Sequence, residues 1–125
     1  MTISIERLTS FNSEVLLAVT QFNNEYLVEH PTDWDCCGFA NPKIVFGRKR
    51  KIKNELIEAG IVKDSDSYSH WAGKYHVVRL SRDIAPHVGH QSMTYAEKRA
   101  RVIMNVMKLH FPEIAEMLDI DSYMD

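Results

Sequence analysis

The segment from Tyr95 to His110 constrains the fold most, because its apolar residues recur at the spacing of one face of an α-helix. Thr94, followed three residues later by Glu97, matches a capping box, which predicts that the helix starts there. Pro112 cannot continue a helix and ends the pattern. The core face of this helix is predicted to carry Ala96, Ala100, Ile103, Met104 and Met107.

Two further helices are expected in the first half of the chain. The first is capped by Asn12 or Ser13 and ends at His30-Pro31, because a residue before proline avoids helical backbone. The second runs from Arg48 to Ala59, and Gly60 is a suitable residue just beyond its end. The apolar stripe of the first helix would consist of Val15, Val19, Phe22 and Tyr26, widened by Leu16 and Leu27.

Two segments are predicted to be extended. Residues Lys74 to Ser81 alternate strand-forming side chains with Arg79 on the opposite face from Val78 and Leu80. The segment Cys36 to Phe46 is also extended, and its proline, Pro42, predicts an edge strand or a bulge. Polar loops are expected at 64–69 and 83–93, and a short amphipathic tail at 113–118. The fold class is therefore α+β, with about three helices packed on a short antiparallel sheet in a single domain, 1–125.

Composition excludes several classes of protein. The chain has 125 residues, of which 45% are hydrophobic and 26% charged, as in ordinary globular domains. No apolar run approaches the roughly 20 residues of a membrane-spanning helix, and the N-terminus lacks the features of a secretory signal. Cys36 and Cys37 are adjacent, and a disulfide between neighbours is strained, so two reduced thiols in the cytoplasm are expected.

No pattern points to a cofactor, a metal or a reaction. The sequence contains no P-loop, dinucleotide-binding glycines or zinc-protease helix, so no cofactor is expected. His87 and His90 have a ligand-like spacing but are interpreted as polar loop residues, and no metal is expected. Cys37 lacks a neighbouring base that would make it a nucleophile and is interpreted as a buried core thiol. The protein is therefore not expected to be an enzyme.

Charge is unevenly distributed along the chain, although the net charge is only −2. Six basic residues and no acidic one lie between Lys43 and Lys53, whereas residues 113–125 hold five acidic residues and no basic one. The run Arg48-Lys49-Arg50-Lys51 falls at a helix start, where cations oppose the helix dipole. Arg48 and Arg50 are therefore candidates for phosphate binding, and the alternative is a solvated basic face.

Two further groups of residues are candidates for anion or nucleotide binding. Gln91 and Ser92 precede a helix start with free backbone N–H groups, close in sequence to Lys98 and Arg99. The alternative is that Gln91 and Ser92 only end a loop and bind backbone. The second group lies around the strand from Lys74 to Ser81, where aromatic residues beside arginines could stack bases and hold phosphates. The alternative is a core tryptophan, a half-buried tyrosine and surface arginines. This group consists of Trp71, Tyr75, Arg79 and Arg82.

Several short motifs resemble those of a family of small phage and prophage proteins. These motifs are Asp35-Cys36-Cys37-Gly38-Phe39-Ala40, the helix ending at Gly60, Trp71-Ala72-Gly73, Gln91-Ser92-Met93 and the terminal Ser122-Tyr123-Met124-Asp125. The chain departs from the family pattern at Asn41-Pro42, at Tyr123, where arginine is common, and in the glycine cluster, which is reduced to Gly73. The resemblance implies a phage origin and no particular reaction.

A counter-defence role in the host cytoplasm is the function that this resemblance favours. We expect a binding protein that captures a small nucleotide-like or anionic ligand. The alternative is an inhibitor that binds a host nucleic-acid-handling protein complex, or nucleic acid itself, through the basic helix. A homo-oligomer is also expected, because the first helix has apolar residues around much of its circumference. The predicted ligand-binding residues are Arg48, Arg50, Trp71, Tyr75, Arg79, Arg82, Gln91, Ser92 and Arg99.

Overall fold

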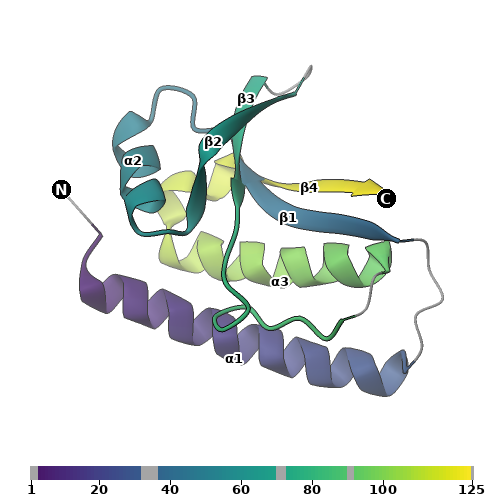
Figure 1. Ribbon diagram of the computed structural model, residues 1–125. Coiled ribbons are helices and arrows are strands. Elements are labelled where there is room, and N and C mark those ends of the chain that lie inside the picture. The colour runs from purple at the N-terminus through teal and green to yellow at the C-terminus, as the bar shows by residue number, and fades with distance from the viewer. Residues whose placement is uncertain (1–2, 32–36, 70–72, 90–91, 125) are drawn as a thin grey trace.

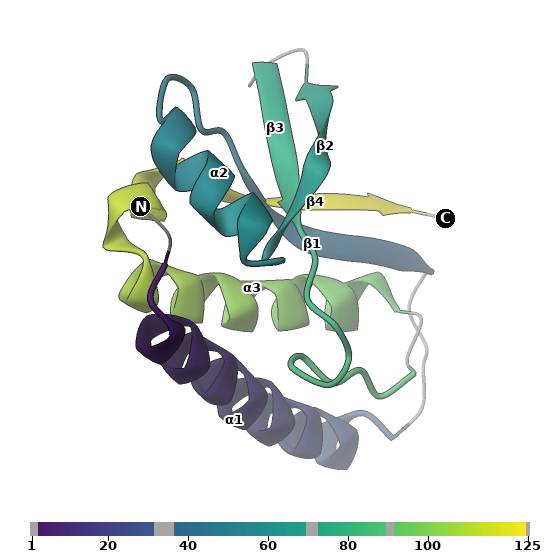
Figure 2. The same ribbon diagram turned by 60° about the vertical axis from the view of Figure 1, so that its left-hand side comes forward.

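A computed structural model describes residues 3–31, 37–69, 73–89 and 92–124. The elements are, in order, α1 (Ile5–Glu29), β1 (Gly38–Ile44), α2 (Arg50–Glu58), β2 (Val62–Ser69), β3 (Gly73–Val78), α3 (Met93–His110), the 3-10 helix η1 (Pro112–Met117) and β4 (Leu118–Met124). In Figures 1 and 2, α3 runs beneath β1 and β4, and α1 lies on the side of α3 away from the sheet. The predicted α+β domain, with helices on an antiparallel sheet, is confirmed.

The four strands form one antiparallel sheet in the order β2-β3-β1-β4. Strands β1 and β4 pair along their whole length, from Gly38↔Met124 to Ile44↔Leu118. Strands β1 and β3 pair only at Lys43↔Val77 and Ile44↔His76. The β2–β3 hairpin consequently turns away from β1, and Figure 1 shows it rising steeply from the level of β1 and β4.

Pro42 lies in an interior strand, so the predicted edge position is wrong. The register places Pro42 opposite Ile120 of β4, with β3 on the other side of the strand. A proline is tolerated there because the paired positions of β1 and β3 stop at Lys43, so no β3 carbonyl needs the missing N–H.

Two strands arise where no strand was predicted. The segment expected to be a polar loop, 64–69, belongs to β2, because pairing with β3 outweighs the low strand propensity of its aspartates and serines. The predicted amphipathic tail is η1, and the chain then continues as β4. Leu118 and Ile120 alternate with Asp119 and Asp121, which is the period of a strand with one apolar face.

Helix α1 begins earlier than expected. Ser4 caps it by accepting a hydrogen bond from the Arg7 N–H (3.1 Å), whereas Asn12 and Ser13 lie inside the helix. The predicted end at His30 is confirmed. Val15, Val19 and Tyr26 of the predicted stripe are buried, but Leu16 and Leu27, which were predicted to widen it, are exposed. Ile5, Leu17 and Val28 of α1 are exposed as well.

Helix α2 is shorter than predicted, and it starts without a side-chain cap at Lys49. Its apolar face, Ile52 and Leu56, packs into the main core as expected. Gly60 has φ = 80°, the left-handed conformation that closes a helix and favours glycine.

Helix α3 starts at Ser92 rather than at Thr94, so the predicted capping box is wrong. The Ser92 hydroxyl accepts the Tyr95 N–H (3.1 Å), and Ser92 is 3% exposed. The first helical turn presses on β1, since a Cβ atom on Gly38 would lie 2.9 Å from Cβ and Cγ of Met93. Serine at the cap and close packing of Met93 together extend the helix beyond the predicted start.

The assignment of Ser92 as the cap predicts that two alanine variants near the start of α3 differ in stability. Ser92→Ala should lower the free energy of unfolding by about 1 kcal/mol, because it removes the acceptor for the Tyr95 N–H. Thr94→Ala should cost less than Ser92→Ala, because Thr94 lies inside α3 and does not cap it. Urea unfolding followed by circular dichroism measures both. A larger loss for Thr94→Ala than for Ser92→Ala would contradict the observed cap.

Candidate functional site

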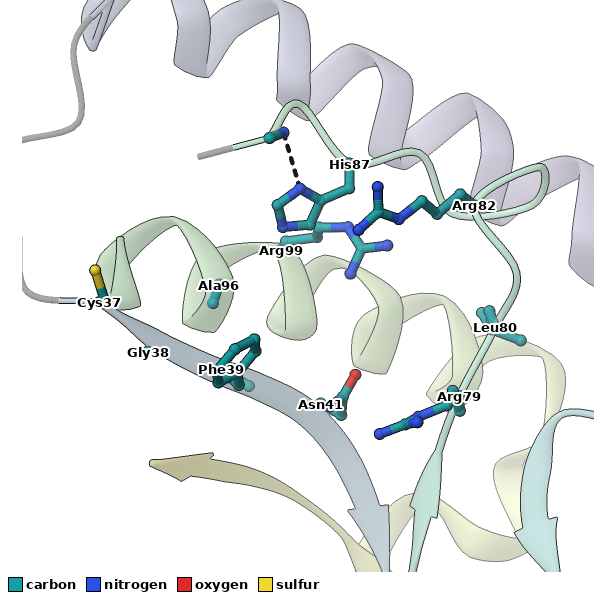
Figure 3. Close-up of a pocket in the computed structure, with 12 residues that line it drawn as sticks. Cys37, Gly38, Phe39, Asn41, Arg79, Leu80, Arg82, His87, Ala96 and Arg99 are labelled. Carbon is teal, nitrogen blue, oxygen red and sulfur yellow. Dashed lines mark hydrogen bonds between the residues drawn. The ribbon is translucent and has the colours of Figure 1, made fainter. Parts of the chain in front are cut away.

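A cavity of about 570 Å³ lies where β3 has separated from β1. One wall is the start of β1, the opposite wall is the loop that follows β3, and α3 contributes Ala96 and Arg99 (Figure 3). Its volume falls within the range of about 300–1,000 Å³ that small-molecule sites occupy. The described lining residues are Cys37, Gly38, Phe39, Ala40, Asn41, Arg79, Leu80, Arg82, His87, Gly89, Ala96 and Arg99.

Three arginines converge on this cavity, two from the loop after β3 and one from α3. Arg79 directly follows β3, Arg82 lies three residues further along the loop, and Arg99 projects from α3 (Figure 3). No acidic residue is found among the described lining residues, and neither Arg79 nor Arg82 forms an ion pair with any described residue. The cavity therefore carries positive charge that this part of the chain leaves uncompensated, which favours an anionic ligand.

Arg99 also holds the loop in place. Its Nε donates to the Pro86 carbonyl (3.0 Å), and an Nη donates to the Ala85 carbonyl. Burial lowers the pKa of Arg99 from its usual value, because the surrounding protein solvates the charge less well than water does, and the nearby charge of Arg82 lowers it further. Its partners are neutral carbonyls, so Arg99 keeps its full positive charge beside the cavity.

A buried polar network fixes the same loop to both long helices. The Tyr95 hydroxyl donates to Oδ1 of Asn23 (2.7 Å) and accepts the Val88 N–H (3.3 Å). The Asn23 amide nitrogen donates to the Pro86 carbonyl (3.0 Å), so Pro86 receives hydrogen bonds from both α1 and α3. Groups on a loop anchored in this way are positioned before a ligand arrives, which reduces the ordering cost of binding.

His87 lines the cavity, and contacts to Gly89 and Tyr95 hold its ring in place. Its Nδ1 accepts the Gly89 N–H (2.9 Å), the contact drawn as a dashed line in Figure 3, so the neutral ring carries its proton on Nε2. The ring packs edge-on against Tyr95, with centroids 5.0 Å apart. His87 is thus a positioned polar group in the cavity wall.

The structure brings together only part of the predicted site. Arg79, Arg82 and Arg99, which the sequence analysis placed in two separate groups, share the cavity. Trp71 and Gln91 lie outside the described residues. Ser92 is buried as the cap of α3 and forms a bridge with Cys37, so this part of the loop lies against the start of β1 rather than the end of β3.

Tyr75 does not line the cavity. It lies on β3 under the ammonium group of Lys43, which is 4.8 Å from the ring centroid. The expectation of a buried Cys37 is also wrong, since this thiol is exposed at the cavity rim. Phe39, Asn41 and His87 were not predicted to line a site. The sequence indicated only that Phe39 and Asn41 would lie on the same face of the strand as Cys37.

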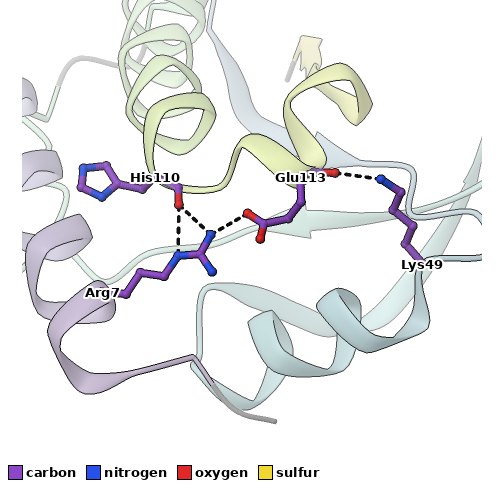
Figure 4. A network of polar contacts seen from close by, with 4 residues as sticks. All are labelled: Arg7, Lys49, His110 and Glu113. Atoms are coloured by element: carbon purple, nitrogen blue, oxygen red, sulfur yellow. Dashed lines mark hydrogen bonds and ion pairs between the residues drawn. The ribbon is translucent and has the colours of Figure 1, made fainter.

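Arg48 and Arg50 lie on a different surface, at the start of α2. They border a shallow depression whose walls include two acidic residues, Glu55 and Glu113. Figure 4 shows how the neighbouring charges are used: Arg7 donates to Oε1 of Glu113 (2.5 Å) and to the His110 carbonyl (2.8 Å). Lys49 donates to the Glu113 carbonyl (3.0 Å), so one of the four predicted cations stabilises the fold.

Other classes of site receive no support from the described residues. Within ranges 3–31, 37–69, 73–89 and 92–124, no three His, Cys, Asp or Glu side chains are grouped as metal ligands. None of the described helices is both long and apolar enough to cross a bilayer. The chain matches no family model, no curated protein and no solved structure.

The buried hydroxyl of Tyr95 predicts a specific alkaline sensitivity. Burial raises the pKa of Tyr95 above its usual value near 10, because the tyrosinate form is poorly solvated. The folded state therefore holds this proton more tightly than the unfolded state, and the free energy of unfolding falls as the pH rises above about 10. Tyr95→Phe should reduce this pH dependence while lowering stability at pH 7 by about 1–3 kcal/mol, since Asn23 loses a buried partner.

Urea unfolding at neutral pH and at about pH 10.5 measures both effects. Tyr75→Phe serves as the control, because the Tyr75 hydroxyl makes no hydrogen bond with a described residue and its removal should alter neither quantity. Equal alkaline sensitivity in the wild-type and Tyr95→Phe proteins would contradict the assignment.

Proposed function

We propose that this protein binds a small anionic, nucleotide-like ligand in the arginine-lined cavity and acts by stoichiometric capture. The observation that carries the proposal is the convergence of Arg79, Arg82 and Arg99 on one cavity whose described lining contains no acid. Guanidinium groups from the loop after β3 and from α3 can surround a phosphate or carboxylate with several charge-assisted hydrogen bonds. The volume of about 570 Å³ suits a ligand of nucleotide size.

The expected affinity follows from these contacts. A hydrogen bond to a charged group contributes about 1.5–3 kcal/mol, and three such contacts offset part of the entropy lost on association. A dissociation constant near the micromolar range corresponds to about 8 kcal/mol of binding free energy, to which the anchored Arg99 and the exposed Arg79 and Arg82 would contribute. Binding should weaken with added salt, because the cavity is open to solvent.

The biological setting of the proposal is counter-defence by a phage. It rests on the resemblance of the Cys-Gly-Phe-Ala, Gln-Ser-Met and terminal motifs to small phage and prophage proteins. A protein that withdraws a nucleotide-like signal from solution needs a fixed binding site and no reaction, and the anchored loop supports that role.

A second candidate function is binding of nucleic acid, or of a nucleic-acid-handling protein, through the basic surface at the start of α2. The observation in its favour is that Arg48 and Arg50 are exposed and form no ion pair with a described residue. The two acids in the same depression offset part of its positive charge, whereas the described lining of the cavity contains no acid. Loss of polyanion binding in an Arg48→Glu, Arg50→Glu double variant would support this candidate.

Self-association is also proposed, through the exposed apolar side of α1. Leu17 is 70% exposed and Val28 is 83% exposed, and both lie on the side of α1 that leaves the core. Light scattering at micromolar concentration gives the mass, and a homodimer or larger assembly is the expected result.

Charge reversal in the cavity tests the main proposal. Arg79→Glu and Arg82→Glu should each weaken binding of inorganic pyrophosphate at least about tenfold, because each removes a charge-assisted contact and adds repulsion. Arg101→Glu is the matched control, since Arg101 is exposed on α3 and does not line the cavity. Isothermal titration calorimetry at low salt measures the dissociation constants. An equal loss in all three variants would show non-specific attraction and would contradict a defined site.

A further inference from the structure

The unpaired edge of β1 faces the arginine cavity and offers hydrogen-bonding groups of its own. β3 pairs with β1 only at Lys43 and Ile44, so β1 has no neighbour among the described strands on that edge from Gly38 to Asn41. The cavity occupies the space that β3 would fill if it continued alongside β1. The polar groups on this edge therefore belong to the site.

The register identifies which backbone groups point into the cavity. The Val45 N–H donates to the carbonyl of Met117, the residue before β4. Successive residues of a strand direct their N–H and C=O groups to opposite edges, so Phe39, Asn41 and Lys43 direct theirs to β4 as well. Ala40 consequently directs its N–H and C=O away from β4, toward the cavity, and no described residue hydrogen-bonds to them there.

The exposed part of this edge is short. Pro42 has no N–H, and the register directs its carbonyl to β3, next to the Lys43↔Val77 pair. At the other end, Met93 is packed against Gly38, and Ser92 forms a bridge with Cys37. Ala40 is left as the one residue that presents both a donor and an acceptor. A peptide strand that adds to a sheet edge needs a backbone donor and acceptor at every second residue of that edge. One such residue fits a small planar group better than a strand.

An aromatic side chain stands beside this donor and acceptor. Phe39 lines the cavity and is 49% exposed, so its ring is accessible to a ligand there. Figure 3 shows its ring rising from β1 on the same side as the Asn41 and Arg79 side chains. An exposed ring next to paired polar groups is how proteins bind a heterocyclic base, by stacking and by hydrogen bonds to the base edge.

We infer that the ligand is a nucleotide whose phosphates bind the three arginines and whose base packs on Phe39 and hydrogen-bonds to the Ala40 backbone. Every nucleobase carries a neighbouring donor and acceptor on one edge, which matches the N–H and C=O of a single extended residue. This inference rests on the proposed anion site and adds a second half to it. The base contacts would distinguish a nucleotide from a simple oxyanion such as pyrophosphate, which would contact the arginines alone.

Calorimetric titrations with inorganic pyrophosphate and with ADP, GDP, CDP and UDP test the base contact. These ligands carry similar phosphate charge, so differences among them report on the base. We expect at least one nucleotide to bind ten times or more tightly than pyrophosphate. In ¹⁵N-labelled protein, the Ala40 amide signal should shift on addition of that nucleotide and remain in place on addition of pyrophosphate.

Variants at Phe39 localise the effect. Phe39→Ala should bring nucleotide affinity down to that of pyrophosphate and leave pyrophosphate binding unchanged, whereas Phe39→Trp should keep the nucleotide preference. Leu109→Ala is the matched control, because Leu109 is 72% exposed and lies outside the cavity lining. Thermal unfolding of each variant confirms that it is folded.

Two failures are distinguishable. If pyrophosphate binds as tightly as every nucleotide, or if Phe39→Ala retains the preference, the base site is wrong and the anion site stands. If neither pyrophosphate nor any nucleotide binds, the proposed anion site fails, and the inference fails with it.

Discussion

The buried hydrogen bond between the Tyr95 hydroxyl and Asn23 is the contact on which the arrangement of the cavity depends. It joins α1 to α3 and places both beside the loop after β3, which Asn23 and Arg99 then hold through the Pro86 carbonyl. A buried polar group is costly unless it is paired, so these residues favour one position of the loop over its alternatives. That position sets where Arg82 and His87 stand, because both lie on the loop.

The cavity itself originates in the sheet. Pro42 cannot donate to a neighbouring strand, and the pairing of β1 with β3 extends only over Lys43 and Ile44. The β2–β3 hairpin is then free to twist away, and Figure 2 shows it standing across the direction of β1 and β4. On the face of β1 toward α3, Ala40 packs against Ala96 and Ala100. These three side chains are small, so they do not fill the space that β3 leaves beside β1.

Much of the architecture could be predicted from periodicity, and the errors have local causes. Val15, Val19 and Ala100 are buried where a helical spacing placed them, and Val78 is buried where strand alternation did. The β2 segment was missed because its strand exists only through pairing with β3, which no local propensity encodes. Arg79, Arg82 and Arg99 could be identified as candidates from their residue type and neighbours, but the sequence placed them in two separate groups. Phe39 could not be placed beside them, since the separation of β3 from β1 is a tertiary property.

The two positively charged surfaces differ in how their charge is compensated. At the start of α2, Glu113 accepts from Arg7 through its carboxylate and from Lys49 through its carbonyl, so part of the basic charge is used within the fold. Arg99 is instead solvated by the neutral carbonyls of Ala85 and Pro86, which satisfy its hydrogen bonds without cancelling its charge. A carboxylate in their place would have removed the positive potential of the cavity. The anchoring of the loop by backbone carbonyls therefore gives the site both its fixed shape and its charge.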